Sequence, residues 1–568
     1  MKLLCVFSVL CGLVFPALAL DREAFTFTKY DLDVRVEPEQ QRLAVRGKLW
    51  LRNDSPSAQR NLVLQISSTL AWRSIKIAGN PVEFTSHDYT SDMDHTGTLS
   101  EAVVTLPREI APGGTVEVEI GYEGTVTMDA TRLTRIGIPE EKAKHTDWDQ
   151  ISKSFSAVRG IGFVTWYPVA TEAAGLSEGD SVSETVGRWK EKETDASMKL
   201  KVGRTGEGSV SPARCNGEGG VGLYEQMGRA YSVTTDCSYF PLRSKIPVFV
   251  IGNYSAIDRA PVNISYLPGQ EEAAKTYADA VGEIDEAIPV VGGGAKGLQI
   301  LGLPDPDAAS FVTDGMLVCP LKLPLTNETM LSLAYAKARS MVSSPRAWIQ
   351  EGLAHYAQAA FIEDEVGRKA ALDYLSAHAT TLVEAEKAAA GKDGAGNWQA
   401  AHSLINAADG LYLQTKAMYV WWMLRDMLGK LPGEALQNYH VADDKDAAYL
   451  LRLIEKSTHR DLEWFFDDWV YRDRGLPDFR VDSVYPREIV GGGYMVTVTV
   501  ENLGEAGAEV PVTLRMPSGD VTRRLEVRGK SKASLRVATS ALPQEVVVND
   551  GSVPEGDVSN NRYKIEGR

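Results

Sequence analysis

Glu351 and His355 are the two residues whose types and spacing suggest a metal site. They stand four positions apart in a run of helix-forming residues, so they share one face of the predicted helix. A carboxylate and an imidazole are both accepted ligands of divalent transition metals, and a third ligand could come from His378 or His402. The same pair is also compatible with a hydrogen-bonded or solvated helix face. Spacing alone therefore leaves both interpretations open.

The helix that carries Glu351 is predicted to begin near Ala347. Pro345 precedes it, in a position that suits the approach to a helix better than its interior. The apolar residues that recur at helical spacing, and so should face the core, are Ile349, Leu353, Tyr356 and Ala360. Within this helix the pattern Trp-x-x-Glu-Gly-x-Ala-x-Tyr resembles the segment that carries the third zinc ligand in the gluzincin aminopeptidases of the membrane alanine aminopeptidase family.

This resemblance implies a zinc site whose other ligands lie on a preceding helix. In the family that helix carries His-Glu-x-x-His, with two histidine ligands and a glutamate that acts as base toward zinc-bound water. In the matching helix just upstream, Tyr335, Ala336 and Arg339 fall on the first His, the Glu and the second His. The other possible register contains no histidine either. His145 and His355 are consecutive histidines in the chain, so no register restores the motif.

Two further motifs of the family are altered as well. Its Gly-x-Met-Glu-Asn signature, whose Glu binds the free amine of the substrate, matches residues 314–318, where Leu317 and Val318 replace the Glu and the Asn. The family's transition-state tyrosine lies two residues before a Lys-Gly pair. Here that position is Gln414, and Tyr412 lies two residues further back. Tyr412 is either a catalytic tyrosine in a shifted register or an ordinary helix tyrosine.

Glu351 needs a new partner if the zinc has been lost, because a buried carboxylate without a counter-charge is costly. Arg339 lies on the former ligand face and offers a cation that can bind a carboxylate with two hydrogen bonds. We therefore predict an Arg339–Glu351 ion pair at the vacated zinc position, and we expect no cofactor. Under the alternative, zinc binds at a noncanonical site that includes Glu351 and His355, with Tyr412 as a catalytic residue.

The rest of the chain predicts an α+β multidomain protein. Period-two alternation and turn clusters predict an N-terminal β domain over residues 20–265. Helical periodicity dominates residues 266–474 and includes a helix over residues 411–428. Alternation then returns, and about six or seven short strands predict a C-terminal β-sandwich over residues 475–568. In terms of the resemblance, these are a β-saddle, a gluzincin-like mostly helical domain and a β-sandwich.

Residues 1–19 have the composition of a secretory signal peptide. A positively charged second residue, an apolar run and a small-x-small cleavage site ending at Ala19 follow one another. We expect cleavage near Ala19 and a secreted or periplasmic protein. No later apolar run approaches the ~18–20 residues that a transmembrane helix needs, so no transmembrane segment is expected in the mature chain. In an oxidising compartment Cys215 and Cys237 either form a disulfide or remain buried thiols.

The composition narrows the classes of function. The chain has 568 residues and a formal net charge of −16, which argues against a nucleic-acid partner, since such a partner requires a basic face. The sequence therefore favours an exported aminopeptidase-family protein that lacks His-Glu-x-x-His and is not an enzyme, but binds a peptide or protein ligand. The alternative is an active zinc metalloaminopeptidase that uses a noncanonical site.

Overall fold

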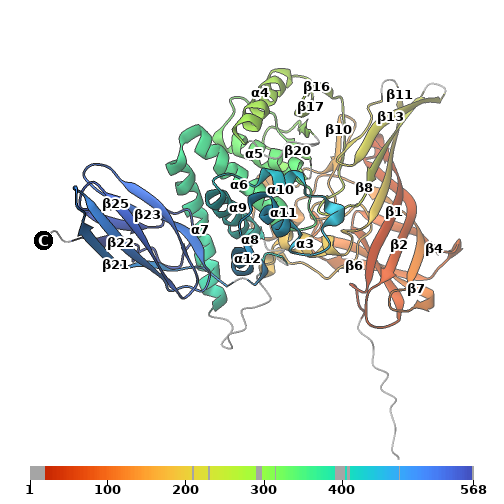
Figure 1. The fold of residues 1–568 in the computed structure, drawn as a ribbon. Coiled ribbons are helices and arrows are strands. Elements are labelled where there is room, and N and C mark those ends of the chain that lie inside the picture. The colour runs from red at the N-terminus through yellow and green to blue at the C-terminus, as the bar shows by residue number, and fades with distance from the viewer. Residues whose placement is uncertain are drawn as a thin grey trace, which may run out of the picture.

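The computed structural model describes residues 20–207, 210–227, 230–288, 297–313, 315–390, 403–405, 410–472 and 474–565. The predicted signal peptide, residues 1–19, lies outside the described residues, as do Asp314 and His402. The described chain is an α+β protein with several sheets (Figure 1). The C-terminal sheets lie at the left of Figure 1, the long helices in the middle and the first sheet at the right.

The largest sheet has eight strands and comes from the first part of the chain. The residue pattern that favours a strand is visible on β1 (Phe25–Glu37), where Leu32, Val34 and Val36 are buried and the charged residues between them are exposed. In sheet order the strands are β13 (Glu218–Met227), β14 (Ala230–Tyr239), β11 (Ser197–Glu207), β1 (Phe25–Glu37), β2 (Arg42–Asn53), β8 (Thr115–Thr125), β4 (Leu70–Ile77) and β5 (Asn80–Pro81).

Two smaller sheets and three short helices complete this part of the chain. One sheet contains β3 (Gln59–Ser67), β7 (Thr98–Ile110) and β6 (Phe84–Thr90). The other contains β12 (Arg214–Cys215), β15 (Phe249–Gly252), β10 (Phe155–Val158) and β9 (Gln150–Ile151). The helices are α1 (Thr131–Arg135), α2 (Glu140–Thr146) and α3 (Val182–Glu191). Cys215 on β12 and Cys237 on β14 form a disulfide, which decides between the two states that the sequence allowed.

A five-stranded mixed sheet leads into the helices. Its order is β16 (Ser255–Arg259), β17 (Val262–Tyr266), β18 (Leu298–Gly302), β20 (Met316–Cys319) and β19 (Phe311–Thr313). Strand β17 pairs in parallel with β18, so this sheet includes strands on both sides of the boundary expected after residue 265. The boundaries expected at residues 265 and 474 stay predictions.

The helices are α4 (Glu271–Ala287), α5 (Asn327–Met341), α6 (Ala347–Val366), α7 (Arg368–Ala390), α8 (Gly410–Gln414), α9 (Lys416–Leu428), α10 (Gly433–Gln437), α11 (Tyr449–Thr458) and α12 (Glu463–Phe466). The single helix expected over residues 411–428 is divided into α8 and α9 at Thr415. The Thr415 hydroxyl donates a 2.7 Å hydrogen bond to the carbonyl of Leu411, the kind of bond by which threonine bends a helix. Gly429, in the left-handed region at φ 74, ends α9 as the sequence predicts. No helix among the described residues has both the length and the apolar character that crossing a bilayer requires.

The C-terminal part consists of two sheets. One contains β21 (Phe479–Glu488), β22 (Tyr494–Asn502) and β25 (Lys532–Thr539). The other contains β24 (Val521–Val527), β23 (Ala508–Arg515), β26 (Glu545–Val548) and β27 (Arg562–Lys564). The alternating valines of β22 and β23 are fully buried, because their side chains fill a common hydrophobic core.

An ion network joins the second of these sheets to the helices. Asp426, near the end of α9, lies within ion-pair distance of three guanidinium groups, at 2.7, 3.1 and 3.4 Å, from Arg368, Arg425 and Arg524. These arginines hold the pKa of the Asp426 carboxyl below its usual value although burial opposes that shift. Arg524 lies on β24, so the network fixes this sheet against α9.

Candidate functional site

Tyr335, Arg339 and Glu351 meet between helices α5 and α6. Tyr335 and Arg339 are one turn apart on α5 and therefore share one of its faces. The start of α5 is fixed by Thr326, whose hydroxyl accepts a 3.2 Å hydrogen bond from the backbone N–H of Thr329. Glu351 lies in the second turn of α6, which begins at the position that the sequence predicts.

The predicted Arg339–Glu351 ion pair is present. Arg339 Nη1 lies 2.5 Å from Glu351 Oε1, and the Tyr335 hydroxyl donates a 2.5 Å hydrogen bond to Glu351 Oε2. Arg339 Nη1 also donates to the Tyr335 hydroxyl oxygen at 3.2 Å. The side chains of Arg339 and Glu351 are 10% and 20% exposed. Burial raises the pKa of Tyr335 well above its usual value, with the charge of Arg339 opposing, so this hydroxyl remains a donor at neutral pH.

These residues do not fit a zinc ion. A guanidinium keeps its protons in proteins and has no lone pair to offer a metal. Both carboxylate oxygens of Glu351 already accept hydrogen bonds from Arg339 and Tyr335. Ala336, at the position where the family has its catalytic glutamate, is buried and carries no group that transfers a proton. The cation that lies beside the Glu351 carboxylate is the guanidinium of Arg339.

His355 faces the same cluster, one turn after Glu351 on α6. Its ring centre lies 4.9 Å from that of Tyr335, and its Nδ1 lies 2.9 Å from Gln358 Oε1. Burial lowers the pKa of His355, and the negative charge of Glu351 opposes that shift, so the imidazole is neutral at pH 7. Nδ1 of His378 is 2.9 Å from a backbone carbonyl of its own helix. Across the described ranges, Glu351 and His355 belong to no group of three closely spaced metal-binding side chains.

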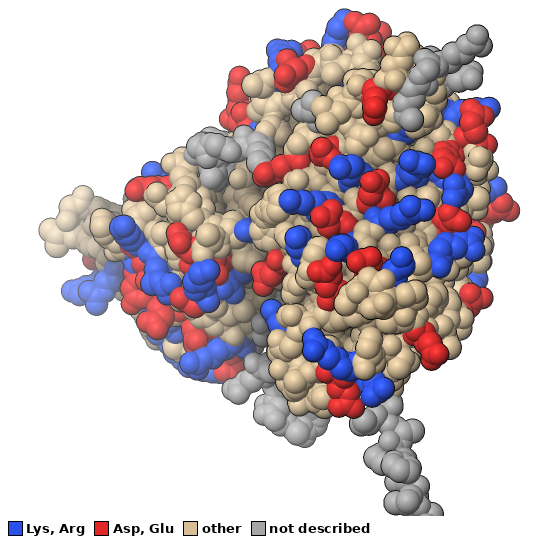
Figure 2. Space-filling view, turned by 90° about the vertical axis from the view of Figure 1, so that its right-hand side faces the viewer, with Lys and Arg blue, Asp and Glu red and all other residues tan. Residues whose placement is uncertain are grey.

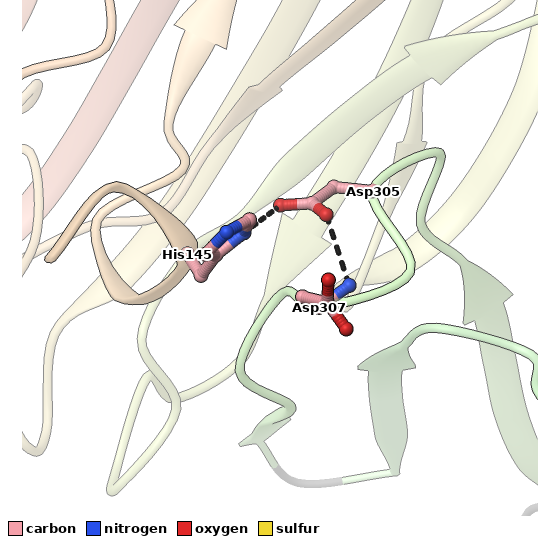
Figure 3. Close-up of side chains that lie close together, drawn as sticks. All are labelled: His145, Asp305 and Asp307. Atoms are coloured by element: carbon pink, nitrogen blue, oxygen red, sulfur yellow. Dashed lines mark hydrogen bonds and ion pairs between the residues drawn. The ribbon is translucent and has the colours of Figure 1, made fainter. Parts of the chain in front are cut away.

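The described residues hold one such group elsewhere, made by His145, Asp305 and Asp307 (Figure 3). His145 on α2 lies with Nδ1 2.6 Å from Oδ2 of Asp305, in the turn after β18. Two ligands of one zinc ion stand about 3 Å apart or more, so this contact is a direct hydrogen bond. Lys322 Nζ lies 3.1 Å from Asp307 Oδ1 and already balances its charge. We interpret the group as a partly exposed ion-pair network between two segments.

Gly352, in the Glu-Gly pair of the motif, has a packing role. A Cβ atom added there would lie 2.7 Å from Cβ of Ala417 and 2.9 Å from its backbone carbonyl. Helix α6 therefore approaches the start of α9 so closely that only glycine fits. This contact keeps Glu351 beside α5 and α8.

A cleft lies beside the Arg339–Glu351 pair, and the other positions predicted from the sequence differ in whether they line it. Leu317 and Val318 lie on β20, an inner strand of the five-stranded sheet, and both are buried in hydrophobic cores. Tyr412 is buried on α8 and does not line this cleft. Gln414, where the resemblance expects the family's tyrosine, does line it.

A cleft of about 550 Å³ lies beside the Arg339–Glu351 pair. Its walls come from α3, β19, the second half of α5, the start of α6, and α8, together with Arg243, Ser244 and Ile246. Charged and apolar side chains share the lining, and among them are Lys190, Arg243, Phe311, Val312 and Leu413. The Arg339–Glu351 pair therefore forms part of the wall of this cleft.

The β19 side of the cleft was not identified from the sequence. Phe311, Val312 and Thr313 line the cleft from an edge strand that pairs with β20 alone among the described strands. Three residues with ordinary β-propensity carry no signal that distinguishes an edge strand from an inner one. Their position follows from the order of strands in the sheet, which is a tertiary property.

Comparison with known proteins gives the fold. No protein-family model matches the sequence, and no curated protein matches it either. Among solved structures, aminopeptidase A of Legionella pneumophila in complex with aspartic acid is similar at TM-score 0.57 and 12% identity. The similar region covers 94% of this chain and 59% of that one, so the chain spans less than two thirds of that protein's length.

A second structure, the M1 zinc metallopeptidase from Deinococcus radiodurans, gives TM-score 0.47 at 15% identity and covers 80% of this chain and 95% of its own. At that score the likeness adds no argument. The first comparison is sufficient for the class: this chain has the fold of the gluzincin zinc aminopeptidases, as the resemblance implied. At 12% identity the likeness shows the fold alone.

Proposed function

We propose that this chain is a non-catalytic relative of the zinc aminopeptidases that binds an extended peptide, or an extended segment of a protein, in the cleft beside Glu351. The observation that carries the proposal is the Arg339–Glu351–Tyr335 cluster, in which a guanidinium pairs with the carboxylate that the resemblance assigns to the zinc. Because the cluster satisfies both carboxylate oxygens, nothing in it activates a water molecule for hydrolysis.

The shape of the cleft supports a peptide as the ligand. Its volume of about 550 Å³ is that of an ordinary ligand site, and it is not filled by Tyr335 or Arg339, which line it. Strand β19 ends its sheet among the described strands and lines one wall, and an extended peptide can add to an edge strand as a further strand. The mixed apolar and charged lining suits side chains of both kinds.

An exported location fits the same proposal. The Cys215–Cys237 disulfide supports it, because disulfides persist in oxidising compartments and are rare in the cytosol. The proposal therefore includes a secreted or periplasmic location, with the signal peptide removed near Ala19. The proposed partners are peptides or proteins.

Two measurements test the absence of catalysis. After dialysis against zinc and then against buffer, elemental analysis should find zinc far below one equivalent. Aminoacyl-arylamide hydrolysis should not exceed that of a preparation of Glu351→Ala. Stoichiometric zinc that disappears in Glu351→Ala, together with turnover that disappears with it, would establish the active metalloaminopeptidase with a noncanonical site instead.

Peptide binding has its own test, with a matched control. The probe is a fluorescein-labelled tryptic digest of denatured casein, a mixture of unstructured peptides, followed by fluorescence anisotropy. Ala347 is exposed at the start of α6 and lines the cleft, so Ala347→Trp should obstruct it and weaken binding by about tenfold or more. Ala377→Trp on α7, also exposed but outside the cleft lining, should bind as the parent does. Equal binding by both variants would refute the cleft as the peptide site.

A further inference from the structure

Strand β13 forms a long open edge of the eight-stranded sheet. Among the described strands it pairs with β14 alone, and it ends the sheet on that side. The opposite edge is β5, a strand of two residues. In Figure 1 strands β11 and β13 extend to the upper right margin of the molecule, away from the long helices. The backbone along β13 is thus accessible to another strand.

The side chains on this edge are unusually apolar for a surface. Leu223 and Tyr224 on β13 are each 62% exposed, and Tyr231 on β14 is 38% exposed. Tyr231 pairs with Gln226, and Val233 pairs with Tyr224, so the two tyrosines lie on the same face of the hairpin. Together they form an exposed aromatic patch beside open backbone groups.

Several other edge strands of this protein carry lysine, arginine or proline, and β13 carries none. Proteins protect edges with lysine or arginine, with proline, or by making the strand short. Strand β21 contains Arg480, Pro486 and Arg487, and the edges β24 and β25 contain arginine or lysine. The sequence of β13, Glu-Gly-Gly-Val-Gly-Leu-Tyr-Glu-Gln-Met, has no lysine, arginine or proline. Its bulge between Gly219 and Gly222 interrupts only the first half of the strand.

We propose that β13 is a self-association surface, on which the β13 strand of a second copy of this chain pairs in antiparallel orientation. An open strand edge is complementary to another strand rather than to a helix or a lipid surface. Pairing with a second copy consumes both open edges at once and closes on a two-fold axis, so no edge is left for further growth. This inference is independent of the peptide cleft.

The pattern of charge along the regular half of β13 supports a second copy as the partner. From Gly222 to Met227 the only charged residue is Glu225. A two-fold axis at Tyr224 sets the two tyrosines opposite each other and Glu225 of each copy opposite Leu223 of the other. Like charges then do not meet, and an aromatic pair lies at the centre, which is a favourable cross-strand arrangement.

Sedimentation equilibrium of the full mature chain between about 1 and 100 µM tests the proposal, since a weak specific dimer dissociates in the micromolar range. The parent should show a reversible monomer–dimer equilibrium. Tyr224→Lys places two ammonium groups opposite each other and should raise the dimer dissociation constant by about tenfold or more. Leu223→Lys should also weaken the dimer, because a lysine on the edge is a natural protecting residue.

The control is Tyr485→Lys, which alters a tyrosine that is 68% exposed on β21. It should leave the dissociation constant unchanged, as should the cleft variant Ala347→Trp. A protein that is monomeric at every concentration refutes the proposal. A dimer that Tyr224→Lys does not weaken refutes it as well, and binding of labelled extended peptides at this edge without self-association would assign the edge to a different partner.

Discussion

Arg339→Met removes the charge that faces Glu351 while keeping most of the length of the side chain. Removing one partner of a buried ion pair costs about 3–5 kcal/mol, and an exposed pair is worth about 0–1 kcal/mol. With the two side chains 10% and 20% exposed, and with Tyr335 still donating to Glu351, we expect a loss of about 2–3 kcal/mol in the free energy of unfolding.

The double variant Arg339→Met, Glu351→Leu separates the ion pair from ordinary packing. If Glu351 is costly only because its counter-charge is gone, removing both charges should restore about 1–2 kcal/mol relative to the sum of the single changes. A metal-binding role for Glu351 predicts a different result, because Arg339→Met would then bring zinc-dependent stability that the double variant lacks.

Tryptophan fluorescence during urea unfolding measures these changes. The chain has 11 tryptophans, so the signal follows global unfolding. It includes Trp348 on α6, which is buried with its ring centre 5.9 Å from that of Trp421 on α9. Arg487→Met, which alters an exposed arginine on β21, is the control and should change the stability by less than about 0.5 kcal/mol. An Arg339→Met protein as stable as this control, or strictly additive single and double variants, would refute the reasoning.

Three further changes test other parts of the structure. Gly352→Ala should destabilise the protein by about 1–3 kcal/mol, because the added Cβ would press on Ala417. The control is Gly282→Ala on α4, where no atom lies within 4 Å of the added Cβ, and it should stabilise the protein by about 0.5–1 kcal/mol. Thermal unfolding compares the two variants, and equal shifts in the unfolding temperature would contradict the close approach of α6 and α9. Glu555, between β26 and β27, is buried, and burial raises its pKa from 4.5 to about 7, with the nearby carboxylate of Asp478 adding to the shift. Because the folded state then favours the protonated acid, the contribution of Glu555 to stability is full below about pH 4.5 and is lost as the pH rises through about 7. Glu555→Gln should flatten the pH dependence of the free energy of urea unfolding in this window. An unchanged pH dependence in the variant would contradict this expectation. Asp426→Asn removes the carboxylate shared by three arginines and should lower the free energy of unfolding by about 2–4 kcal/mol. Limited proteolysis between the helices and the C-terminal sheets should then be faster than in the parent. An equal increase in cleavage elsewhere in the chain would contradict a role of Asp426 at this junction.

One face of the molecule carries charges of both signs. On the face shown in Figure 2 the Lys and Arg side chains are intermixed with Asp and Glu side chains, without a broad area of one sign. Interspersed charges of this kind keep a protein soluble and give no steering field for a polyanion. The absence of a nucleic-acid partner stays a prediction from the net charge.

Local sequence patterns were sufficient to predict the helices and strands and to show that the His-Glu-x-x-His motif is absent from the sequence. The apolar spacing from Ile349 to Tyr356 predicts α6 and its buried face, and the alternating valines predict the C-terminal strands, because each period follows from the geometry of one element. The lack of histidine between His145 and His355 requires no structure at all, since no fold supplies a ligand that the chain does not contain. Even the Arg339–Glu351 pair follows from two neighbouring helices and from the cost of an isolated buried charge.

Relations between distant segments required the tertiary structure. Thr415 divides the helix expected over residues 411–428 into α8 and α9. Phe311 and Leu317 are both buried strand residues, but only Phe311 also lines the cleft, because sheet order places β19 outside β20. The sequence by itself determined that this chain cannot build the family's zinc site, since that depends on which residues are present. Only the tertiary structure decided that the predicted Arg339–Glu351 pair borders a cleft, since that depends on how helices and strands far apart in the chain pack together.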